Sequence, residues 1–280
     1  MDIVWLGEPG ATDPAAVGGK TANLSRFAST HRVPAGFCVT TGAAGLAPAE
    51  RAARVAHAYR TLASRTGEPE PGVAVRSSAV DEDGALSSFA GLHETYLNLR
   101  GADAVARAVE RCRASATSER ARTYRRERGL AVNVGIAVLV QHLVPADVSA
   151  VVFTADPATG ARDVVVDASW GLGESVVGGT VTPDHYVVRR ESLAVVRRTA
   201  GAKERMTVLA PEGTREVAVP TVMRGRLVLD DDAVLAAARL ALALETELGV
   251  PVDVECAFRD GLVYLLQCRP ITRLGALEGV

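Results

Sequence analysis

The segment from Pro251 to Arg273, PVDVECAFRDGLVYLLQCRPITR, most constrains the fold, because it predicts two short strands joined by a tight turn. Asp253 and Glu255 lie two residues apart in an apolar run, and so do Gln267 and Arg269. Side chains two residues apart on a strand point to the same face of the sheet. Each predicted strand therefore carries two polar groups on one face and apolar side chains on the other.

The turn of this hairpin sets its register. A three-residue loop, Arg259-Asp260-Gly261, with Gly261 in the left-handed region, pairs residue 258 with residue 262 and Asp253 with Gln267. In that register the polar side chains share one face. The opposite face is expected to be apolar and consists of Val252, Val254, Leu266 and Cys268.

The polar face has the chemistry of a metal–phosphate site. A carboxylate and an amide oxygen suit a hard cation such as Mg²⁺, which usually keeps waters and substrate phosphates as its remaining ligands. Arg269 carries a permanent positive charge on a planar fork, which suits a phosphoryl group that is being transferred. The hairpin alone is equally consistent with a cross-strand polar cluster on an exposed sheet.

Composition narrows the range of partners. The chain has 280 residues, of which 48% are hydrophobic and 23% charged, and its formal net charge is −2. This balance predicts a globular chain of one or two domains and does not indicate nucleic acid as a partner. The N-terminal sequence does not resemble an export signal, and no apolar run approaches the 18 residues of a membrane span. The four cysteines are scattered without CxxC spacing, so we expect reduced thiols and a cytoplasmic location.

Lysine is rare, which draws attention to the two positions where it occurs. Of the 31 basic residues only Lys20 and Lys203 are lysines. Lys20 lies in GGKTANLSRF, which predicts a glycine turn that enters an amphipathic helix and offers backbone N–H groups to an anion. The spacing is not that of a Walker A loop. A helix start with a solvated lysine is the alternative. The expected apolar positions of the helix are Ala22, Leu24 and Phe27.

The remaining pattern predicts an α+β fold, because strands and helices do not alternate regularly. We place two lobes at residues 1–184 and 185–280. The expected helices cover 49–64, 102–128 and 231–248. The expected strands before the hairpin cover 37–41, 73–76, 95–99, 137–141, 150–154, 164–168 and 186–189.

Two segments between these elements add candidate binding groups. A strand that ends in Arg76-Ser77-Ser78 leads into a loop of small residues from Gly84 to Gly91, whose backbone amides could approach phosphate oxygens. An unliganded hairpin is the alternative there. Another apolar strand runs into Gln141-His142-Leu143-Val144, a segment that can border an adenine ring but also looks like any core strand leaving a sheet.

Seven motifs in order resemble the ATP-binding part of phosphoenolpyruvate synthase, pyruvate phosphate dikinase and rifampin phosphotransferase. The resemblance extends from Val17 to Thr272. It rests on GGKTANLSRF, VPAGFCVTT, VAVRSSAVDEDGALSSFAGLHETYLNL, VSAVVFTADPATG, ASWGLGESVVGGTVTPDHYVV, GAKERM and DVECAFRDGLVYLLQCRPIT. It implies an ATP-grasp fold, in which two lobes sandwich the nucleotide, with ATP and Mg²⁺ as ligands.

The resemblance also implies roles for individual residues. Lys20 and Arg76 would hold ATP phosphates, and a loop containing Ser87, Ser88 and Gly91 would cover them. Glu255 and Gln267 would ligate Mg²⁺ with support from Asp253, and Arg269 would stabilise the phosphoryl group during transfer. The adenine would be bordered by Gln141, His142, Leu143 and Val144. Two further nucleotide-site positions would be Glu174 and Lys203.

The chain departs from that family in one important respect. Family enzymes pass phosphate to a carrier histidine in a TSHA-type motif and then to an acceptor bound in another domain. The histidines of this sequence, none of which lies in such a motif, are His31, His57, His93, His142 and His185. We therefore expect a phosphotransferase component that performs the ATP half-reaction and relies on a partner protein for the carrier histidine and the small-molecule acceptor. A direct small-molecule kinase and a nucleotide-binding regulatory module without turnover are the alternatives.

Overall fold

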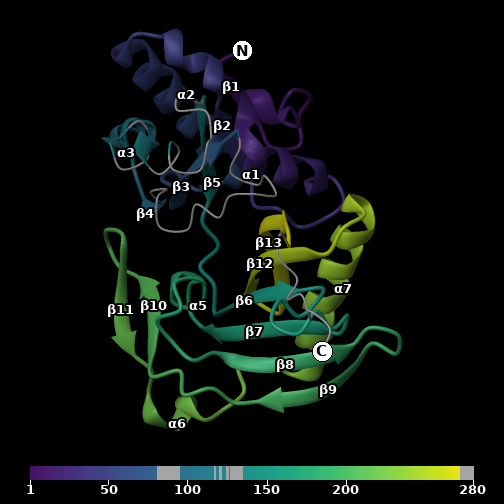
Figure 1. The fold of residues 1–280 in the computed structure, drawn as a ribbon. Helices are drawn as coiled ribbons and strands as arrows, with labels where there is room; N and C mark the ends of the chain where they lie inside the picture. Colours follow the sequence, from purple (N-terminus) through teal and green to yellow (C-terminus); the bar gives the residue numbers. More distant parts are fainter. Residues whose placement is uncertain (81–94, 117, 120–121, 124–125, 127–134, 272–280) are drawn as a thin grey trace. The chain divides into compact units, whose positions relative to one another are not determined.

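The computed structural model describes residues 1–80, 95–116, 118–119, 122–123, 126 and 135–271. These residues form an α+β structure with two compact units, which confirms the expected class (Figure 1). Unit 1 comprises residues 1–30, 34–143 and 211–213, and unit 2 comprises residues 31–33, 144–210 and 214–280. The main division falls between Leu143 and Val144 rather than at residue 184, because the strands that follow Val144 hydrogen-bond into the sheet that contains the C-terminal hairpin.

Unit 1 is built on one antiparallel sheet with the strand order β1-β2-β5-β3-β4. Its strands are β1 (Ile3–Trp5), β2 (Gly36–Val39), β3 (Val73–Ala79), β4 (Thr95–Leu99) and β5 (Ile136–His142). Its helical elements are α1 (Pro14–Phe27), the short 3-10 helix η1 (Thr41–Gly45), α2 (Pro48–Thr66) and α3 (Ala102–Ala116). The helix expected over 102–128 thus ends as α3 at Ala116, and most of its remainder lies outside the described residues.

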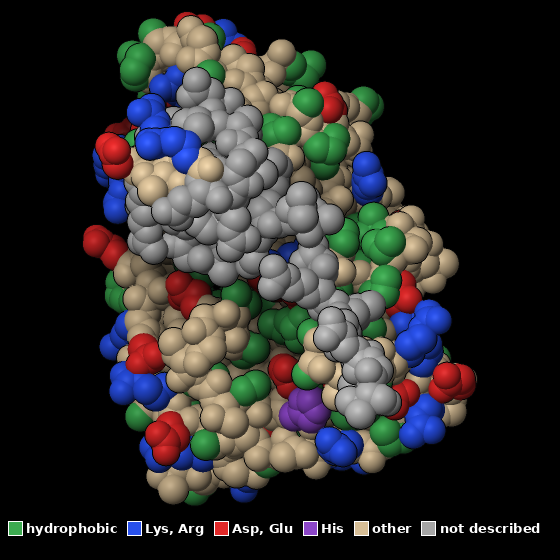
Figure 2. All heavy atoms as spheres, viewed as in Figure 1, with side chains coloured by type: hydrophobic (Ala, Val, Ile, Leu, Met, Phe, Trp, Pro, Cys, Tyr) green, Lys and Arg blue, Asp and Glu red, His purple; other side chains and the backbone are tan. Residues whose placement is uncertain are grey.

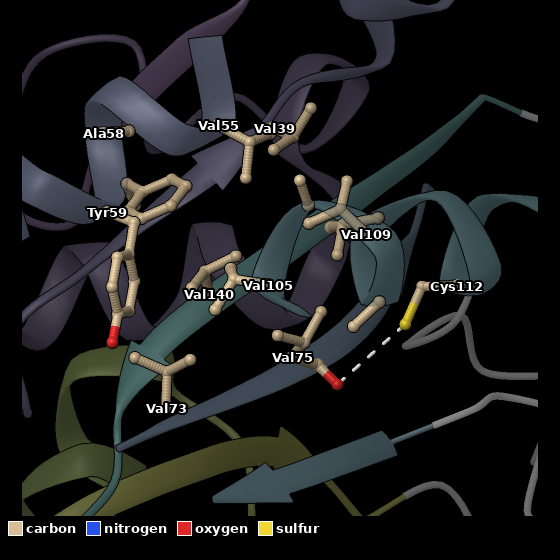
Figure 3. Packing of buried hydrophobic residues seen from close by; sticks show 14 of the residues in the cluster. Val39, Val55, Ala58, Tyr59, Val73, Val75, Val105, Val109, Cys112 and Val140 are labelled. Atoms are coloured by element: carbon tan, nitrogen blue, oxygen red, sulfur yellow. Dashed lines mark hydrogen bonds between the residues drawn. The ribbon is translucent and has the colours of Figure 1, made fainter. Parts of the chain in front are cut away.

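The two faces of this sheet have different neighbours. Side chains that alternate along the strands, such as Val73 and Val75, pack against α2 and α3 and form the main core of unit 1 (Figure 3). Helix α1 contacts β3 and β5. The hydroxyl of Thr21 in α1 lies 3.7 Å from Sγ of Cys38 in β2, and Cys38 does not belong to the core formed with α2 and α3. The period of two in β3 therefore leaves Ala74, Arg76 and Ser78 on the α1 side.

Unit 2 contains a six-stranded antiparallel sheet with the order β13-β12-β6-β7-β8-β9. Its strands are β6 (Val148–Phe153), β7 (Val164–Trp170), β8 (Asp184–Arg189), β9 (Ala194–Thr199), β12 (Val252–Arg259) and β13 (Leu262–Pro270). A separate ribbon pairs β10 (Arg205–Leu209) with β11 (Thr214–Ala218). The helices are α5 (Glu174–Val177), α6 (Thr221–Arg224) and α7 (Asp231–Leu248).

Helix α7 has the bounds that the sequence predicts. The Asp230 carboxylate accepts a hydrogen bond of 2.9 Å from the Ala233 N–H, and Gly249 ends the helix at φ 73°. The helix packs against the strands of the large sheet. Tyr186 of β8 reaches this side, since its hydroxyl donates to the carbonyl of Leu229, just before the helix cap. Residues that alternate with Tyr186 therefore project from the opposite face.

Across the described ranges, no helix has the length and apolar character needed to span a bilayer.

Candidate functional site

The hairpin of β12 and β13 places its four polar side chains on one face, but in a different register from the expected one. The turn has two residues, Asp260 and Gly261, both at positive φ (52° and 73°), which is the geometry of a type I′ turn. Arg259 pairs with Leu262, whereas a three-residue loop would have paired residue 258 with residue 262. The left-handed conformation of Gly261 is confirmed, whereas the predicted three-residue loop is wrong.

A β-bulge restores the polar face beyond the turn. Cys256 pairs with Leu265, and the next pair is Glu255 with Gln267, so Leu266 is an extra residue in β13. Asp253 consequently pairs with Arg269 and not with Gln267. Leu266, which was expected on the apolar face, is half-buried, and Leu265 is the fully buried side chain there.

The opposed pairs are in contact. The Gln267 amide donates to Glu255 Oε1 over 3.2 Å, and Arg269 Nε donates to Asp253 Oδ2 over 2.8 Å. Asp253 and Gln267 are each 8% exposed, whereas the Arg269 side chain is 47% exposed. Burial raises the pKa of Asp253, and the charge and hydrogen bond of Arg269 oppose that rise. Burial has the larger effect on the pKa of Asp253, and the Arg269 side chain keeps about half of its surface open to a ligand.

The donor set suits magnesium. Within the described part of the chain, no three His, Cys, Asp or Glu side chains converge as a dedicated metal cage would require. Mg²⁺ is instead commonly bound through one or two carboxylates together with substrate phosphates and waters. Glu255 with the adjacent amide of Gln267 fits this second mode of binding.

The same face of the sheet continues across three more strands. Strand pairing aligns Glu255 with Val151 of β6, Val151 with Asp167 of β7, and Asp167 with His185 of β8. Directly opposed residues of antiparallel strands share a face. His185 Nδ1 lies 2.8 Å from Asp167 Oδ1. Asp167 is not among the residues expected from the sequence, although a single carboxylate within the apolar run of β7 is a visible signal.

A cavity of about 180 Å³ opens beside the hairpin within unit 2. Its polar lining comprises Asp167, Asp253, Glu255 and Arg269. Its apolar lining comprises Val151, Phe153, Val176, Val177 and Pro183. On the viewed face of unit 2, acidic side chains lie among hydrophobic ones (Figure 2). The candidate metal groups therefore border a recess whose lining is partly charged and partly apolar.

Unit 1 contributes a second group of candidate residues around the start of the helix that follows Gly18. Gly18 interrupts α1 at φ 74° and ψ 165°, so a separate helical segment begins after it. The N–H of Thr21 in its first turn donates to Ser78 Oγ over 3.2 Å. A Cβ at position 18 would lie 2.1 Å from the carbonyl oxygen of Ser78. Glycine is therefore required here by both its positive φ and the close approach of β3. The expected apolar positions Ala22, Leu24 and Phe27 are buried.

Arg76 and Lys20 lie near this helix start. Arg76 precedes Ser78 by two residues on β3 and so shares its face. Its Nε is buried and has no hydrogen-bond partner among the described residues. A buried guanidinium N–H without a partner is costly, which fits a position intended for an anion. Lys20 is partly exposed and lies within the first turn after Gly18. The expected covering loop, with Ser87, Ser88 and Gly91, lies outside the described residues.

The segment expected to border adenine lies at the end of β5. Two of its N–H groups are already used, since His142 donates to the carbonyl of Ala35 and Leu143 donates to that of Gly72. The Gln141 side chain is buried and donates to the carbonyl of Pro34 over 3.3 Å. A base at this segment would therefore bond other backbone groups, and Val144, 7% exposed, would offer an apolar contact.

The two remaining candidates, Lys203 and Glu174, are both in unit 2. Lys203 is completely buried, and its ammonium group is paired with the equally buried Asp184 and donates to the carbonyl of Gly201 over 2.9 Å. This arrangement gives Lys203 a structural role and leaves no exposed ammonium for a phosphate. Glu174 is exposed at the start of α5 and accepts from the Thr214 hydroxyl over 3.0 Å.

Comparison with known proteins identifies the family of the chain. A family model described as pyruvate phosphate dikinase, AMP/ATP-binding domain, matches residues 43–279. The probable phosphoenolpyruvate synthase of Methanocaldococcus jannaschii is 43% identical over 79% of this chain and 19% of its own length. The rifampicin phosphotransferase of Streptomyces sviceus is 38% identical over 97% of this chain and 36% of its own length. The chain thus spans about a fifth to a third of these relatives.

Similarity to solved structures is distant. The D-alanine–D-alanine ligase of Bacillus anthracis aligns with a TM-score of 0.40 and 9% identity, over 95% of this chain and 59% of the ligase.

Proposed function

Because the chain belongs to the pyruvate phosphate dikinase AMP/ATP-binding domain family, we propose that it performs the ATP half-reaction of a dikinase-type phosphotransferase. ATP is the substrate that the family description supports. In the proposed reaction a carrier histidine receives the β-phosphoryl group, and AMP is released. The observation that carries the proposal is the shared polar face of the hairpin, where Glu255 contacts Gln267 and Asp253 contacts Arg269.

The residues of unit 2 supply the metal and transfer groups in this proposal. Glu255 and Gln267 hold Mg²⁺, which when bound neutralises charge on the phosphates. Arg269 presents its half-exposed fork to the phosphoryl group, where negative charge must be stabilised in the transition state. Asp253 keeps the arginine in place by accepting its Nε–H. We propose no nucleotide contact for Lys203.

The residues of unit 1 supply the phosphate-binding groups. The N–H groups after Gly18 lie at the positive end of a helix dipole, and Lys20 adds an ammonium charge in the first turn of that helix. Arg76 adds a second permanent charge. The end of β5, with Gln141, His142, Leu143 and Val144, borders the base, and Glu174 is assigned to the nucleotide site on family resemblance alone.

The acceptor is proposed to be a histidine outside this sequence. None of the five histidines lies in a TSHA-type motif. We propose that a partner protein in trans presents the carrier histidine and binds the small molecule that finally receives the phosphate. The contribution of this chain ends with the phosphorylated carrier.

The experiment that tests this function follows the β-phosphorus. The chain is incubated with Mg²⁺ and ATP labelled at the β position, with and without a candidate partner, and AMP and labelled protein are measured. Label on the partner together with AMP supports the proposal. Formation of ADP with γ-label on a small molecule indicates a direct kinase. Label retained on one of the chain's own histidines contradicts the proposal that a partner protein presents the carrier histidine.

A conservative variant tests the role of Arg269 in the same assay. Arg269→Lys keeps the charge but loses the planar fork, so we expect nearly unchanged ATP affinity and slower transfer. Arginines in this role can contribute about 10³ to 10⁵ in rate. Equal transfer rates in the variant and the parent would rule out the role.

A further inference from the structure

The cavity in unit 2 has an apolar wall that the proposed metal and phosphate roles do not use. This wall consists of Val151, Phe153, Val176, Val177 and Pro183. Val177 is 55% exposed, so the wall is reachable from solvent. Phosphates and metal ions are bound by polar groups, so these apolar side chains indicate that an additional group binds in the recess.

The size of the cavity limits its occupant. Its volume is about 180 Å³, whereas sites for drug-sized ligands usually measure about 300–1,000 Å³. A whole nucleotide would therefore extend beyond it. A single ring with an apolar face and a polar edge is the kind of group that such a mixed lining accepts.

Asp167 supplies the polar contact. One of its oxygens, Oδ1, is bonded to His185 Nδ1 over 2.8 Å, which fixes the orientation of the carboxylate. No hydrogen bond to its Oδ2 is found among the described residues, and Asp167 lines the cavity. The structure therefore leaves one carboxylate oxygen to accept an N–H from the occupant.

The charges in the lining favour an occupant that donates hydrogen bonds or gains positive charge. The lining has three carboxylates, from Asp167, Asp253 and Glu255, and one guanidinium, from Arg269. Arg269 is paired with Asp253. Glu255 is assigned to Mg²⁺, so Asp167 remains as the negative group of the lining that neither the arginine nor the metal neutralises.

We propose that this cavity binds the imidazole ring of the acceptor histidine, with the ring against the apolar wall and its N–H bonded to Asp167. The assignment rests on the function proposed above and adds the residues that recognise the acceptor. Asp167 orients the ring and favours the tautomer whose other nitrogen carries the lone pair. His185 is a positioning residue, because it acts through Asp167.

The proposed step is phosphoryl transfer from ATP to the bound imidazole ring. The lone pair of the free imidazole nitrogen forms a bond to the β-phosphorus of ATP, and the bond from that phosphorus to the oxygen shared with the α-phosphate breaks. The electron pair of the broken bond leaves on AMP, and the imidazole first carries both the β- and the γ-phosphoryl groups. Water then attacks the γ-phosphorus, which releases inorganic phosphate and leaves the β-phosphoryl group on the ring. The ring keeps its other proton and becomes positively charged, and Asp167 stabilises that charge through its hydrogen bond.

Free imidazole is the probe for the test. The variant is Asp167→Asn, which keeps the shape of the side chain and removes its charge. The matched control is Asp147→Asn, which changes a 56% exposed carboxylate of unit 2 that pairs with Arg259 away from the cavity. Three quantities are measured: Mg–ATP affinity by calorimetry, saturation transfer from protein to imidazole by NMR with Mg²⁺ and AMP present, and β-label transferred to imidazole.

For Asp167→Asn we expect an unchanged Mg–ATP affinity, loss of the imidazole signal, and a fall of about 10²-fold in the rate of label transfer. Val177→Trp, which fills the cavity from an exposed position, should also remove the imidazole signal. Equal imidazole signals in the parent and Asp167→Asn would overturn the proposal. So would a parallel loss of Mg–ATP affinity, because Asp167 would then act on the nucleotide and not on the acceptor. An imidazole signal that depends on Asp167 without any label transfer in the parent would support the cavity and contradict the proposed half-reaction.

Discussion

At the scale of single residues, the two lysines of the chain have opposite environments. Lys20 is partly exposed at a helix start, whereas Lys203 is fully buried against Asp184. The same carboxylate also accepts from the N–H groups of Gly201 and Val228. One buried charge pair thus holds together the start of β8, the loop before β10 and the turn before α7.

Lys203→Met tests this structural role. The substitution leaves Asp184 buried without its counterion, which typically costs about 3–5 kcal/mol of unfolding free energy. We expect a loss in that range from urea unfolding, and a much smaller loss for Lys20→Met. A loss below about 1 kcal/mol for Lys203→Met would show that backbone N–H groups alone satisfy Asp184.

At the scale of elements, the close packing of α1 on β3 depends on Gly18. Gly67, which ends α2, offers a matched comparison, because both glycines have φ 74° and only Gly18 has a close neighbour. A side chain at Gly67, which has ψ 8°, costs about 1–2 kcal/mol in backbone strain. The strain at Gly18 is larger, because ψ 165° at this φ belongs to a region that essentially only glycine adopts. Only the change at Gly18 also pushes β3 away.

Gly18→Ala should therefore lose more stability than Gly67→Ala in urea unfolding. We further expect it to lower Mg–ATP affinity measured by calorimetry, because it displaces the helix start that is proposed to bind phosphate. Gly67→Ala should leave that affinity unchanged. Similar effects of the two substitutions on affinity would contradict a phosphate site at Gly18.

Helices α2 and α3 are joined by an ion pair that should respond to pH. Arg51, 7% exposed, bonds both oxygens of Glu110 over 2.5 and 2.7 Å. The hydrogen bond from Arg51 lowers the pKa of Glu110. A lowered carboxyl pKa gives stability that is present above the ordinary glutamate pKa of about 4.3 and is lost as pH falls through the lowered value.

Glu110→Gln should remove this pH-dependent contribution. Its unfolding free energy should be below that of the parent at neutral pH, and the difference should shrink as pH falls below about 4.3. Urea unfolding of the variant and the parent at a series of pH values measures this difference in unfolding free energy. A difference that stays constant with pH would show that the ionised pair does not contribute.

At the scale of the whole molecule, the units cannot be separated by one cut in the chain. Residues 31–33 belong to unit 2 although they lie within the sequence of unit 1, and the N–H of Leu265 donates to the carbonyl of Arg32 over 2.9 Å. Residues 211–213 belong to unit 1 although they lie within the sequence of unit 2. Each unit also carries its own group of candidate ligand residues.

If both groups bind one nucleotide, saturating Mg–ATP should stabilise the whole chain. A ligand at 100 times its Kd adds about 2.7 kcal/mol of unfolding free energy. We expect this gain to be largely lost in Lys20→Ala, in unit 1, and also in Glu255→Ala, in unit 2. Thermal unfolding with and without Mg–ATP measures it. A full gain in either variant would remove that unit's residue from the proposed site.

The sequence allowed most elements and the polar hairpin face to be predicted, but not the hairpin register. Relative to the observed two-residue turn, the expected three-residue loop and the bulge at Leu266 shift the pairing by one residue in opposite directions, so the expected and observed registers differ by two residues. Because side chains alternate with a period of two, both registers place Glu255 and Gln267 on the same face. The Asp167–His185 contact depends on the pairing of β7 with β8, which no local pattern specifies.

The bulge at Leu266 also bears on which changes in chain length the hairpin tolerates. Removing Leu266 would leave regular pairing from Arg259 to Asp253, with Glu255 still opposite Gln267. Removing a residue of β12 between Glu255 and the turn would instead bring Leu265 opposite Glu255 and separate the metal-binding pair. The two strands therefore tolerate deletions unequally: β13 can lose one residue and keep the site, whereas β12 must keep its length.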